Sequence, residues 1–504
     1  MSAPSPPRPP RTAAVLAVLA ALLVALGAYG SARASDGLTV RHVTVAGVPL
    51  TEVRASPQAD VGRRPGVVVA HGFAGSARLM RPIADTVARD GMVALLLDFA
   101  GHGANPGRLG GGGRGASEET LAADLDVAVA HLRGLPDVDP ERIYLVGHSM
   151  GAGAVTRWAA DHPEIRRTVA ISLPDAGDAG GARPADLLLI VGGAEFPDFR
   201  RAAEEAAGQG GSTRRLVEVP GVEHISVLFA ARTHAEVAAW LPSDGGSGAR
   251  PTARLLPAGL LLLGLGLGYV PLTVLALGRR SARPRPPASS PGKLLAVAVV
   301  AAGVGAAVAA LVPTARLPLA VGGHVIGFLL VSGLLLAVAG RWSPPRALAS
   351  APLGQGTATP VEHLGTARSV VAAVLLTGYA VLAVAVPIHL GLTSALPVGA
   401  RWWLLPVAAT GCLVFLAGAE RVSGGRTGRH AVVGVLAVLA LTASAVVGLA
   451  PGFVLLVVPL FALLVVWQVA WAAVLRGAGA PSWLPPVVGT ALLAWPVATT
   501  LPLT

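Results

Sequence analysis

Residues 143–160 of this chain read Ile-Tyr-Leu-Val-Gly-His-Ser-Met-Gly-Ala-Gly-Ala-Val-Thr-Arg-Trp-Ala-Ala. The first four residues favour β structure, which predicts a buried strand over 143–146. The segment 154–160 has the apolar spacing of an amphipathic helix. Between them the pattern Gly-x-Ser-x-Gly, centred on Ser149, is typical of a strained turn that exposes a serine hydroxyl at a helix N-terminus. The flanking glycines permit the strand and the helix to approach without Cβ clashes.

The segment 37–241 around this turn alternates short apolar runs with charged stretches of helical period. Strands that alternate with helices predict right-handed crossovers and a mostly parallel sheet, with the ligand site at the carboxyl ends of the strands. A hairpin over 38–54 is expected to precede this arrangement. The other expected strands are 66–70, 93–98, 168–173, 187–191 and 216–219, and the other expected helices are 79–89, 117–132 and 227–241.

His71-Gly72-Phe73 follows the strand 66–70, as a backbone loop that can face the serine turn. With this loop and the Gly-x-Ser-x-Gly turn, the segment 38–241 resembles the α/β-hydrolase superfamily. The resemblance implies that Ser149 is the nucleophile and that the backbone N–H groups of Phe73 and Met150 form an oxyanion hole. It leaves His71 as a residue that orders its own loop.

The resemblance also places a histidine on the loop after the last strand, where His224 follows the strand 216–219. Three residues beyond the strand 187–191 and Gly192 stands Glu195, at the position where the family usually carries an acid. Asp198 is the alternative acid, and Asp175 follows the preceding strand. A glutamate adds one methylene to the more common aspartate, which changes the geometry required at His224.

Other polar residues have expected structural roles. Asp98 precedes the serine in the chain and is expected to be a structural hydrogen-bond acceptor. Five other histidines of the segment are assigned to loop structure or to solvated helix faces; these are His102, His131, His148, His162 and His234.

The order Ser149, Glu195, His224 matches the order nucleophile, acid, histidine of the superfamily. It implies acyl transfer through a covalent serine intermediate that water clears, without a cofactor or a metal ion. The stretch between the strands 168–173 and 187–191 is too short for a large cap domain. The site is therefore expected to be open, or to be covered by the Gly-rich loop 108–115, by the membrane or by another protein.

Composition separates this segment from the rest of the chain. The 504 residues are 53% hydrophobic and only 13% charged, which excludes a single water-soluble globule because its surface could not be covered. An apolar run over 12–30, within an N-terminal tail of 1–36, is long enough to be an uncleaved membrane anchor or a signal peptide, and we favour the anchor. Residues 242–254 are expected to form a flexible linker, and 255–504 a membrane domain. Its eight expected spans are 255–277, 294–312, 317–340, 370–392, 402–419, 431–449, 453–475 and 482–501.

The net charge of +11 comes from the helical half, because residues 251–504 hold 15 basic and two acidic residues. If the N-terminus is cytoplasmic, 14 basic residues fall in the terminal segment and loops on that side, and only Arg316 and Arg401 fall in the opposing short loops. This asymmetry predicts a multi-pass protein of the cell membrane with its α/β domain outside the cytoplasm. The charge is therefore a topology signal, and nucleic acid is not an expected partner.

Together these features predict a membrane-integrated serine hydrolase that cleaves an ester, with a small-molecule or lipid-like acyl substrate and no identified protein partner. An extracytoplasmic acyltransferase is one alternative. The other is a transport or assembly protein with a non-catalytic, hydrolase-like sensor domain. The few polar residues in the expected spans are assigned to helix packing or to the membrane interface; they are His324, Tyr379, His389, Glu420 and Gln468. The single Cys412 excludes internal disulfides.

Overall fold

A computed structural model describes residues 11–56, 62–110, 114–181, 183–210, 213–242, 250–278, 290–341 and 366–504. The chain separates into two compact units. The α/β unit comprises Ala25–Leu261, Pro387–Ala400 and Thr499–Thr504, and the helical unit comprises the chain up to Val24, Leu262–Val386 and Arg401–Ala498. Residues 1–10 of the expected tail and 243–249 of the expected linker lie outside the described residues.

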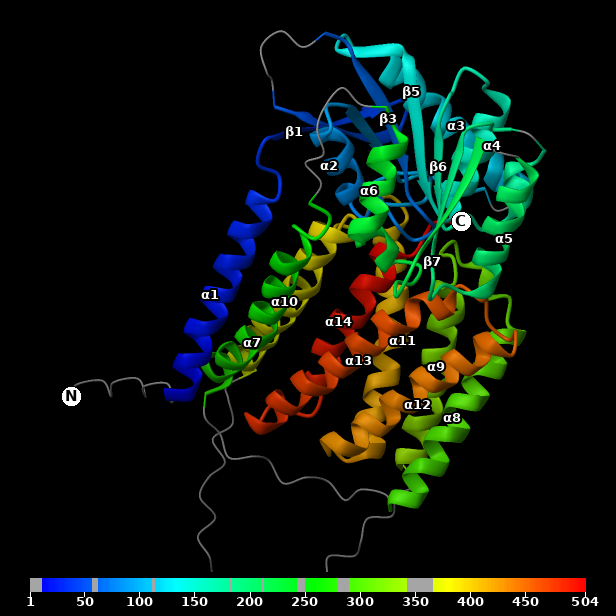
Figure 1. The fold of residues 1–504 in the computed structure, drawn as a ribbon. Helices are drawn as coiled ribbons and strands as arrows, with labels where there is room; N and C mark the ends of the chain where they lie inside the picture. Colours follow the sequence, from blue (N-terminus) through cyan, green and yellow to red (C-terminus); the bar gives the residue numbers. More distant parts are fainter. Residues whose placement is uncertain are drawn as a thin grey trace, which may run out of the picture. The chain divides into compact units, whose positions relative to one another are not determined.

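The α/β unit is built on an eight-stranded sheet with the order β1-β2-β4-β3-β5-β6-β7-β8 (Figure 1). The strands β1 and β2 form an antiparallel hairpin, β2 pairs antiparallel with β4, and the other pairs are parallel, which confirms the mostly parallel sheet. The strands are β1 Leu38–Val45, β2 Val48–Ala55, β3 Arg64–Ala70, β4 Val93–Leu97, β5 Val138–His148, β6 Thr168–Ile171, β7 Leu187–Gly192 and β8 Arg214–Val219.

Helices cover both faces of this sheet. On one face, α2 (Arg81–Arg89) and α6 (Ala231–Trp240) pack with side chains such as Ile83 and Val237 against the strands. On the other, α3 (Arg114–Arg133) and α4 (Met150–Asp161) contribute Leu125, Val155 and others. Because β3 is buried on both sides, it reads as the continuous apolar run Val67–Val69, each fully buried.

The connection between β6 and β7 contains one short 3-10 helix, η1 (Ala176–Ala179), among its described residues. After β7, α5 (Pro197–Gln209) leads to β8, and the 3-10 helix η3 (Ser226–Phe229) precedes α6. These short connections leave the carboxyl ends of β5, β7 and β8 at one edge of the sheet.

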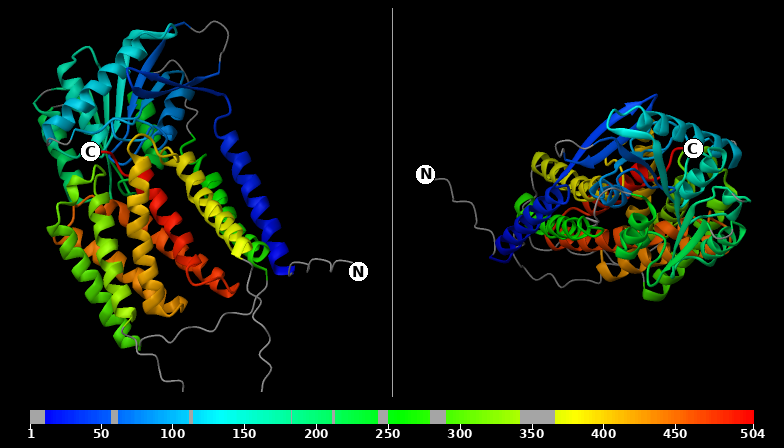
Figure 2. Two further views of the ribbon diagram at one scale, coloured as in Figure 1. Left: turned by 180° about the vertical axis from the view of Figure 1, so that it is seen from behind. Right: turned by 45° about the horizontal axis from the view of Figure 1, so that its top comes forward.

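The helical unit consists of long apolar helices (Figures 1 and 2). Eight helices of the described chain are long and apolar enough to cross a membrane, including α1 near the N-terminus. The ninth expected span, 482–501, is α14, an apolar helix of 17 residues. The helices are α1 Arg11–Arg33, α7 Leu255–Leu277, α8 Pro291–Leu311, α9 Gly322–Arg341, α10 Thr366–Gly391, α11 Arg401–Ser423, α12 Thr427–Val446, α13 Val454–Gly477 and α14 Leu484–Thr500; a short 3-10 helix, η4 (Thr314–Arg316), precedes α9.

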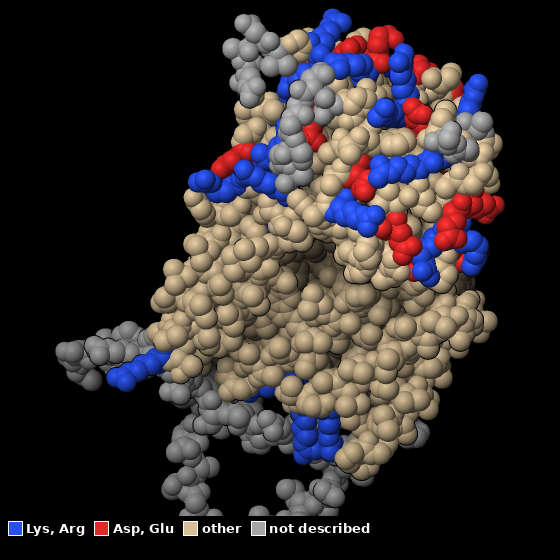
Figure 3. Space-filling view, in the orientation of Figure 1, with Lys and Arg blue, Asp and Glu red and all other residues tan. Residues whose placement is uncertain are grey.

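Close helix packing in this unit depends on glycine. A Cβ atom on Gly333 of α9 would lie 2.4 Å from the backbone nitrogen of Phe415, and one on Gly418 of α11 would lie 2.4 Å from the Gly333 oxygen. Because glycine has no Cβ atom, the backbones of α9 and α11 can approach this closely, as they do at small residues in membrane helix pairs. The two units also differ in surface charge. Figure 3 shows many basic and acidic side chains on the α/β unit, while the visible face of the helical unit is almost free of them.

Candidate active site

Ser149 lies in the tight turn between β5 and α4 that the Gly-x-Ser-x-Gly pattern predicts. Its φ of 53° and ψ of −121° are a strained conformation for a residue with a side chain, held in part by a 2.8 Å hydrogen bond from its N–H to the Ile171 oxygen. A Cβ atom on Gly147 would lie 2.3 Å from the Gly151 oxygen, and one on Gly151 would lie 2.5 Å from the His71 oxygen. Both glycines are therefore required for the strand and the helix to come this close.

The structure brings Ser149, His224 and Glu195 together. The Ser149 Oγ atom lies 3.1 Å from His224 Nε2, and His224 Nδ1 lies 3.1 Å from Glu195 Oε2. Because the carboxylate accepts the Nδ1–H, the Nε2 atom is left to accept the serine proton. The side chains of His224 and Glu195 are 3% and 0% exposed, so water hardly competes for this relay.

Glu195 is held in place by donors on its second oxygen. Its Oε1 atom accepts hydrogen bonds from the Ser172 hydroxyl and from the Gly192 N–H, the latter at 3.0 Å. The loop that carries His224 packs against the end of β7: the Ala194 N–H donates to the Val222 oxygen at 3.0 Å. These contacts direct Oε2 toward the imidazole and accommodate the extra methylene of a glutamate.

The other acidic candidates have different roles. Asp198 begins α5 with a side chain 83% exposed and forms an ion pair with Arg201. Asp175 caps η1 by accepting the Gly177 N–H. Asp98 accepts the backbone N–H groups of Ala77 and Ala104 at 2.7 and 2.8 Å, so it is the structural acceptor that we expected.

The loop 71–73 lies against Ser149. A Cβ atom on Gly72 would be 2.9 Å from the Ser149 Cβ atom, and Phe73 and Met150 both line the cleft beside Ser149. His71 donates from Nδ1 to the Gly72 oxygen at 2.8 Å and accepts the Phe99 N–H at Nε2, at 3.1 Å. His71 is thus a loop-ordering residue, as expected.

His148 has a role that the sequence did not indicate. It is 1% exposed, and its Nε2–H donates to the backbone oxygen of His224 at 2.9 Å, which holds the loop that carries His224. Burial, and then the charge of His224, lower the pKa of His148 to about 3, so it stays neutral. The assignment of His234 to a solvated helix face is wrong: it is fully buried and hydrogen-bonded to Thr86 and the Leu228 oxygen.

The cleft beside Ser149 has a volume of about 440 Å³. Its walls combine apolar side chains such as Leu109 and Leu121 with Arg157, which forms ion pairs with Asp178 and Glu118. Leu109 belongs to the Gly-rich loop 108–115 expected near the site; residues 111–113 of that loop lie outside the described residues.

Two large apolar side chains that follow relay residues in the chain are exposed. Phe196 follows Glu195 and is 42% exposed, and Ile225 follows His224 and is 36% exposed.

Among the described residues, no group of three or more His, Cys, Asp and Glu side chains is placed to hold a metal ion.

Comparison with known proteins links this segment to hydrolases. Residues 63–201 match a family model described as serine aminopeptidase, S33. A protein of Mycobacterium tuberculosis described as uncharacterized is 30% identical over 191 residues, which covers 33% of this chain and 66% of the relative. A thermostable monoacylglycerol lipase of a Bacillus species is 29% identical over 134 residues, covering 27% of this chain and 48% of the lipase.

Among solved structures, a serine hydrolase without a lid from Xanthomonas campestris aligns with a TM-score of 0.32 and 21% sequence identity. The alignment covers 42% of this chain and 97% of that protein. Of the two sequence relatives, the matched part of this chain spans just under two thirds of the mycobacterial protein and about half of the lipase.

Proposed function

Because the α/β unit belongs to the α/β-hydrolase superfamily, we propose that this chain is a serine hydrolase that cleaves an ester or a related acyl bond. The observation that carries the proposal is the continuous relay from Glu195 through His224 to the Ser149 hydroxyl, with 3.1 Å at each of its two steps. The relay ends at a cleft of about 440 Å³, where a substrate carbonyl has room to bind.

The proposed reaction has two halves. In the first, His224 Nε2 takes the Ser149 proton as Oγ attacks the carbonyl carbon, and the N–H groups of Phe73 and Met150 stabilise the oxyanion. The imidazolium then gives its proton to the departing alcohol oxygen, which leaves an acyl-enzyme on Ser149. In the second, His224 takes a proton from a water molecule that attacks the acyl carbon, and the collapse of this intermediate releases the acid and returns the proton to Oγ.

The substrate that best suits this site has a lipid-like acyl chain. Leu109 and Leu121 line the cleft, and the next residues in the chain after Glu195 and His224, Phe196 and Ile225, are exposed and apolar. The apolar side chains in the wall of the cleft favour an acyl chain. The monoacylglycerol lipase among the relatives supports this choice.

The proposed location is the cell membrane, with several spans. The eight long apolar helices fit this location, and the excess of arginine in alternate loops favours a cytoplasmic N-terminus with the α/β unit outside. The bundle would then present the hydrolase to lipids or envelope molecules at the outer surface.

A fluorophosphonate probe, which labels activated serines, tests the chemistry. The full chain in detergent should be labelled, Ser149→Ala should not, and Ser56→Ala, which removes an exposed serine at the end of β2, should be labelled like the wild type. Equal labelling of Ser149→Ala and the wild type would end the proposal. With a panel of acyl esters, release of free acid indicates a hydrolase, whereas an acylated acceptor would identify an acyltransferase.

The orientation is tested separately with a cysteine introduced at an exposed position. In a Cys412→Ala background, Ser56→Cys should react with a membrane-impermeant maleimide in intact cells, because Ser56 lies in the α/β unit. Reaction only after the cells are opened would place the α/β unit in the cytoplasm.

A further inference from the structure

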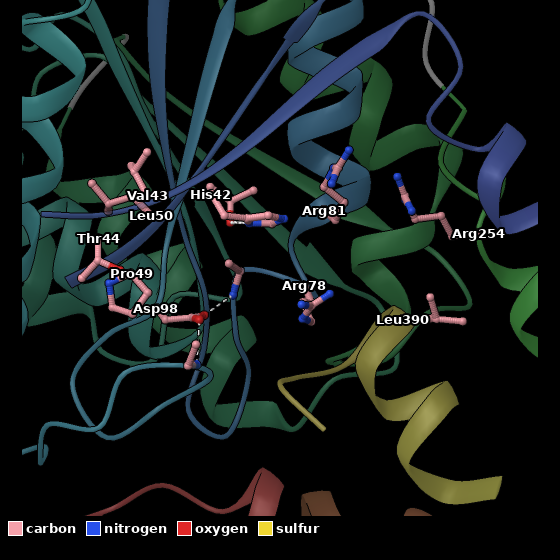
Figure 4. A pocket seen from close by; sticks show the side chains of 13 residues that line it. His42, Val43, Thr44, Pro49, Leu50, Arg78, Arg81, Asp98, Arg254 and Leu390 are labelled. Atoms are coloured by element: carbon pink, nitrogen blue, oxygen red, sulfur yellow. Dashed lines mark hydrogen bonds between the residues drawn. The ribbon is translucent and has the colours of Figure 1, made fainter. Parts of the chain in front are cut away.

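A second cavity of the α/β unit is lined by basic side chains. It has a volume of about 390 Å³ and shares no lining residue with the cleft at Ser149. Figure 4 shows its walls: His42 comes from β1, Arg78 from the turn before α2, Arg81 from the start of α2, and Arg254 and Leu390 from segments next to α7 and at the end of α10. All of these residues belong to the α/β unit.

The positive charges of this cavity exceed the carboxylates that pair with them. Arg81 donates to Asp85 Oδ1 at 2.5 Å, and Arg254 donates to Asp85 Oδ2 at 2.8 Å, so that one carboxylate serves two guanidinium groups. Arg78 donates to a neutral acceptor, the backbone oxygen of His389, at 2.9 Å. Three guanidinium groups therefore line the cavity against two carboxylates, Asp85 and Asp98.

The carboxylate in the cavity wall, Asp98, is already engaged by other donors. It accepts the N–H groups of Ala77 and Ala104, which ties two loops together (Figure 4). Its charge is shared by these two backbone donors and also favours the charged form of Arg78, whereas the ion pairs of Arg81 and Arg254 are made with Asp85. The arginines therefore keep the capacity to bind an anion.

Hydrogen-bond donors in the cavity remain available. The Arg81 Nη2 atom is buried and makes no hydrogen bond within the described part of the chain. Burial lowers the pKa of His42, and Arg78 and Arg81 lower it further, while Asp98 opposes them only in part. A bound anion would satisfy the donor and relieve this repulsion.

We propose that this cavity binds the phosphate group of an anionic phospholipid. Guanidinium groups match phosphate oxygens with paired hydrogen bonds, and three of them converge here. Arg254 directly precedes α7, and Leu390 lies in the last turn of α10, two helices apolar and long enough to span a membrane. A phosphate held where such helices begin and end lies at the depth of lipid headgroups. Free inorganic phosphate offers the same chemistry from another source.

Native mass spectrometry of the full chain in a neutral detergent tests the proposal. The probes are phosphatidylglycerol, zwitterionic phosphatidylcholine and inorganic phosphate. We expect the wild type to retain phosphatidylglycerol in preference to phosphatidylcholine, and Arg78→Gln to bind it about tenfold more weakly, because a charge-assisted hydrogen bond is lost. Arg215→Gln, which removes a surface ion pair with Glu236, is the matched control and should bind like the wild type.

The outcomes distinguish a phospholipid from free phosphate as the ligand. They also test anion binding independently of the proposed hydrolase activity. Wild-type affinity of Arg78→Gln for every probe, or equal retention of phosphatidylcholine and phosphatidylglycerol, would overturn the proposal. Binding of inorganic phosphate alone, lost in Arg78→Gln, would keep an anion site and overturn the lipid. If Arg78→Gln fails to fold, His42→Asn replaces it with the same expectation of weaker binding. Ser149→Ala should bind lipid normally, so this result does not depend on the proposed hydrolase.

Discussion

Buried polar side chains occur in both units of the chain, but they are arranged differently. In the α/β unit, the relay of Glu195 and His224 ends at the Ser149 hydroxyl, which lines a cleft. In the helical unit, Arg476 of α13 donates to both oxygens of Glu420 on α11, and these groups tie helices to one another.

A second pair of buried polar side chains in the helical unit also joins two helices. His430 of α12 lies 3.1 Å from the Gln468 oxygen on α13, and both side chains are buried. A cavity in this unit is lined almost entirely by apolar side chains of α8, α12 and the turn that follows, with Ser444 as its polar member. The comparison teaches that the same residue types lead to a serine hydroxyl at a cleft in one unit and join neighbouring helices in the other.

The largest effect is expected from His224→Gln in the α/β unit. Glutamine cannot take the Ser149 proton, so kcat for an acyl ester should fall by about 10,000-fold while KM changes little. Steady-state hydrolysis of a chromogenic ester measures it. His162→Gln, which removes a ring stacked on Trp158 away from the cleft, should stay within about twofold of the wild type. A small loss in His224→Gln would assign the proton transfer elsewhere.

The same contrast shows what could be predicted from the sequence. The strand, turn and helix around Ser149 follow from local spacing, because a glycine is needed wherever a Cβ atom would lie 2.3 to 2.5 Å from a backbone oxygen. The distance of 3.1 Å between His224 and Ser149 depends on residues 75 positions apart, which local spacing cannot fix. The contact of His148 with the His224 oxygen is likewise set by tertiary packing.

Pairing between strands that are distant in the sequence also moved the observed strand boundaries away from the predicted ones. The strand expected over 143–146 is β5, which begins at Val138 because Val138 pairs with Arg64 of β3 across a register shift. The assignment of residues 387–400 and 499–504 to the α/β unit had no signal in composition, since both stretches begin inside the last turns of apolar helices, α10 and α14.

In the helical unit, Glu420→Gln should destabilise the bundle. It leaves the Arg476 guanidinium, which is 11% exposed, without its carboxylate, and such a loss typically costs about 3–5 kcal/mol. The thermal midpoint of the full chain in detergent should fall, while labelling of Ser149 at low temperature persists. Glu164→Gln, which breaks an exposed pair with Arg133, should cost at most about 1 kcal/mol. A stable Glu420→Gln chain that loses ester hydrolysis would give the bundle a part in the chemistry.

A buried carboxylate of the α/β unit should respond to pH instead. Burial raises the pKa of Asp124 to about 6, against a hydrogen bond from the Ala100 N–H. The folded state therefore keeps a proton that the unfolded state loses, and stability should fall as pH rises from about 4 to about 6 and then level off. Asp124→Asn should remove this slope and raise the stability at neutral pH by about 1–2 kcal/mol. Unfolding midpoints of both chains across this range are the measurement, and parallel curves would contradict it.

The smallest expected effect concerns the C-terminal residues that group with the α/β unit. The Leu109 N–H donates to the Leu503 oxygen and the Leu503 N–H donates to the Gly101 oxygen, each at 2.9 Å, and Leu503 is fully buried. Leu109 lines the cleft beside Ser149, so these bonds hold one wall of the site.

Ending the chain at Thr500 removes both hydrogen bonds, each worth about 1 kcal/mol, and should lower kcat/KM for an acyl ester by about tenfold. Thr504→Ala, which leaves Leu503 in place, should match the wild type. Cleavage by trypsin after Arg108 should become faster in the shortened chain, because the loop loses its anchor. Unchanged cleavage and unchanged kinetics would contradict this prediction. They would mean that the rest of the α/β unit holds the wall at Leu109 without the hydrogen bonds to Leu503.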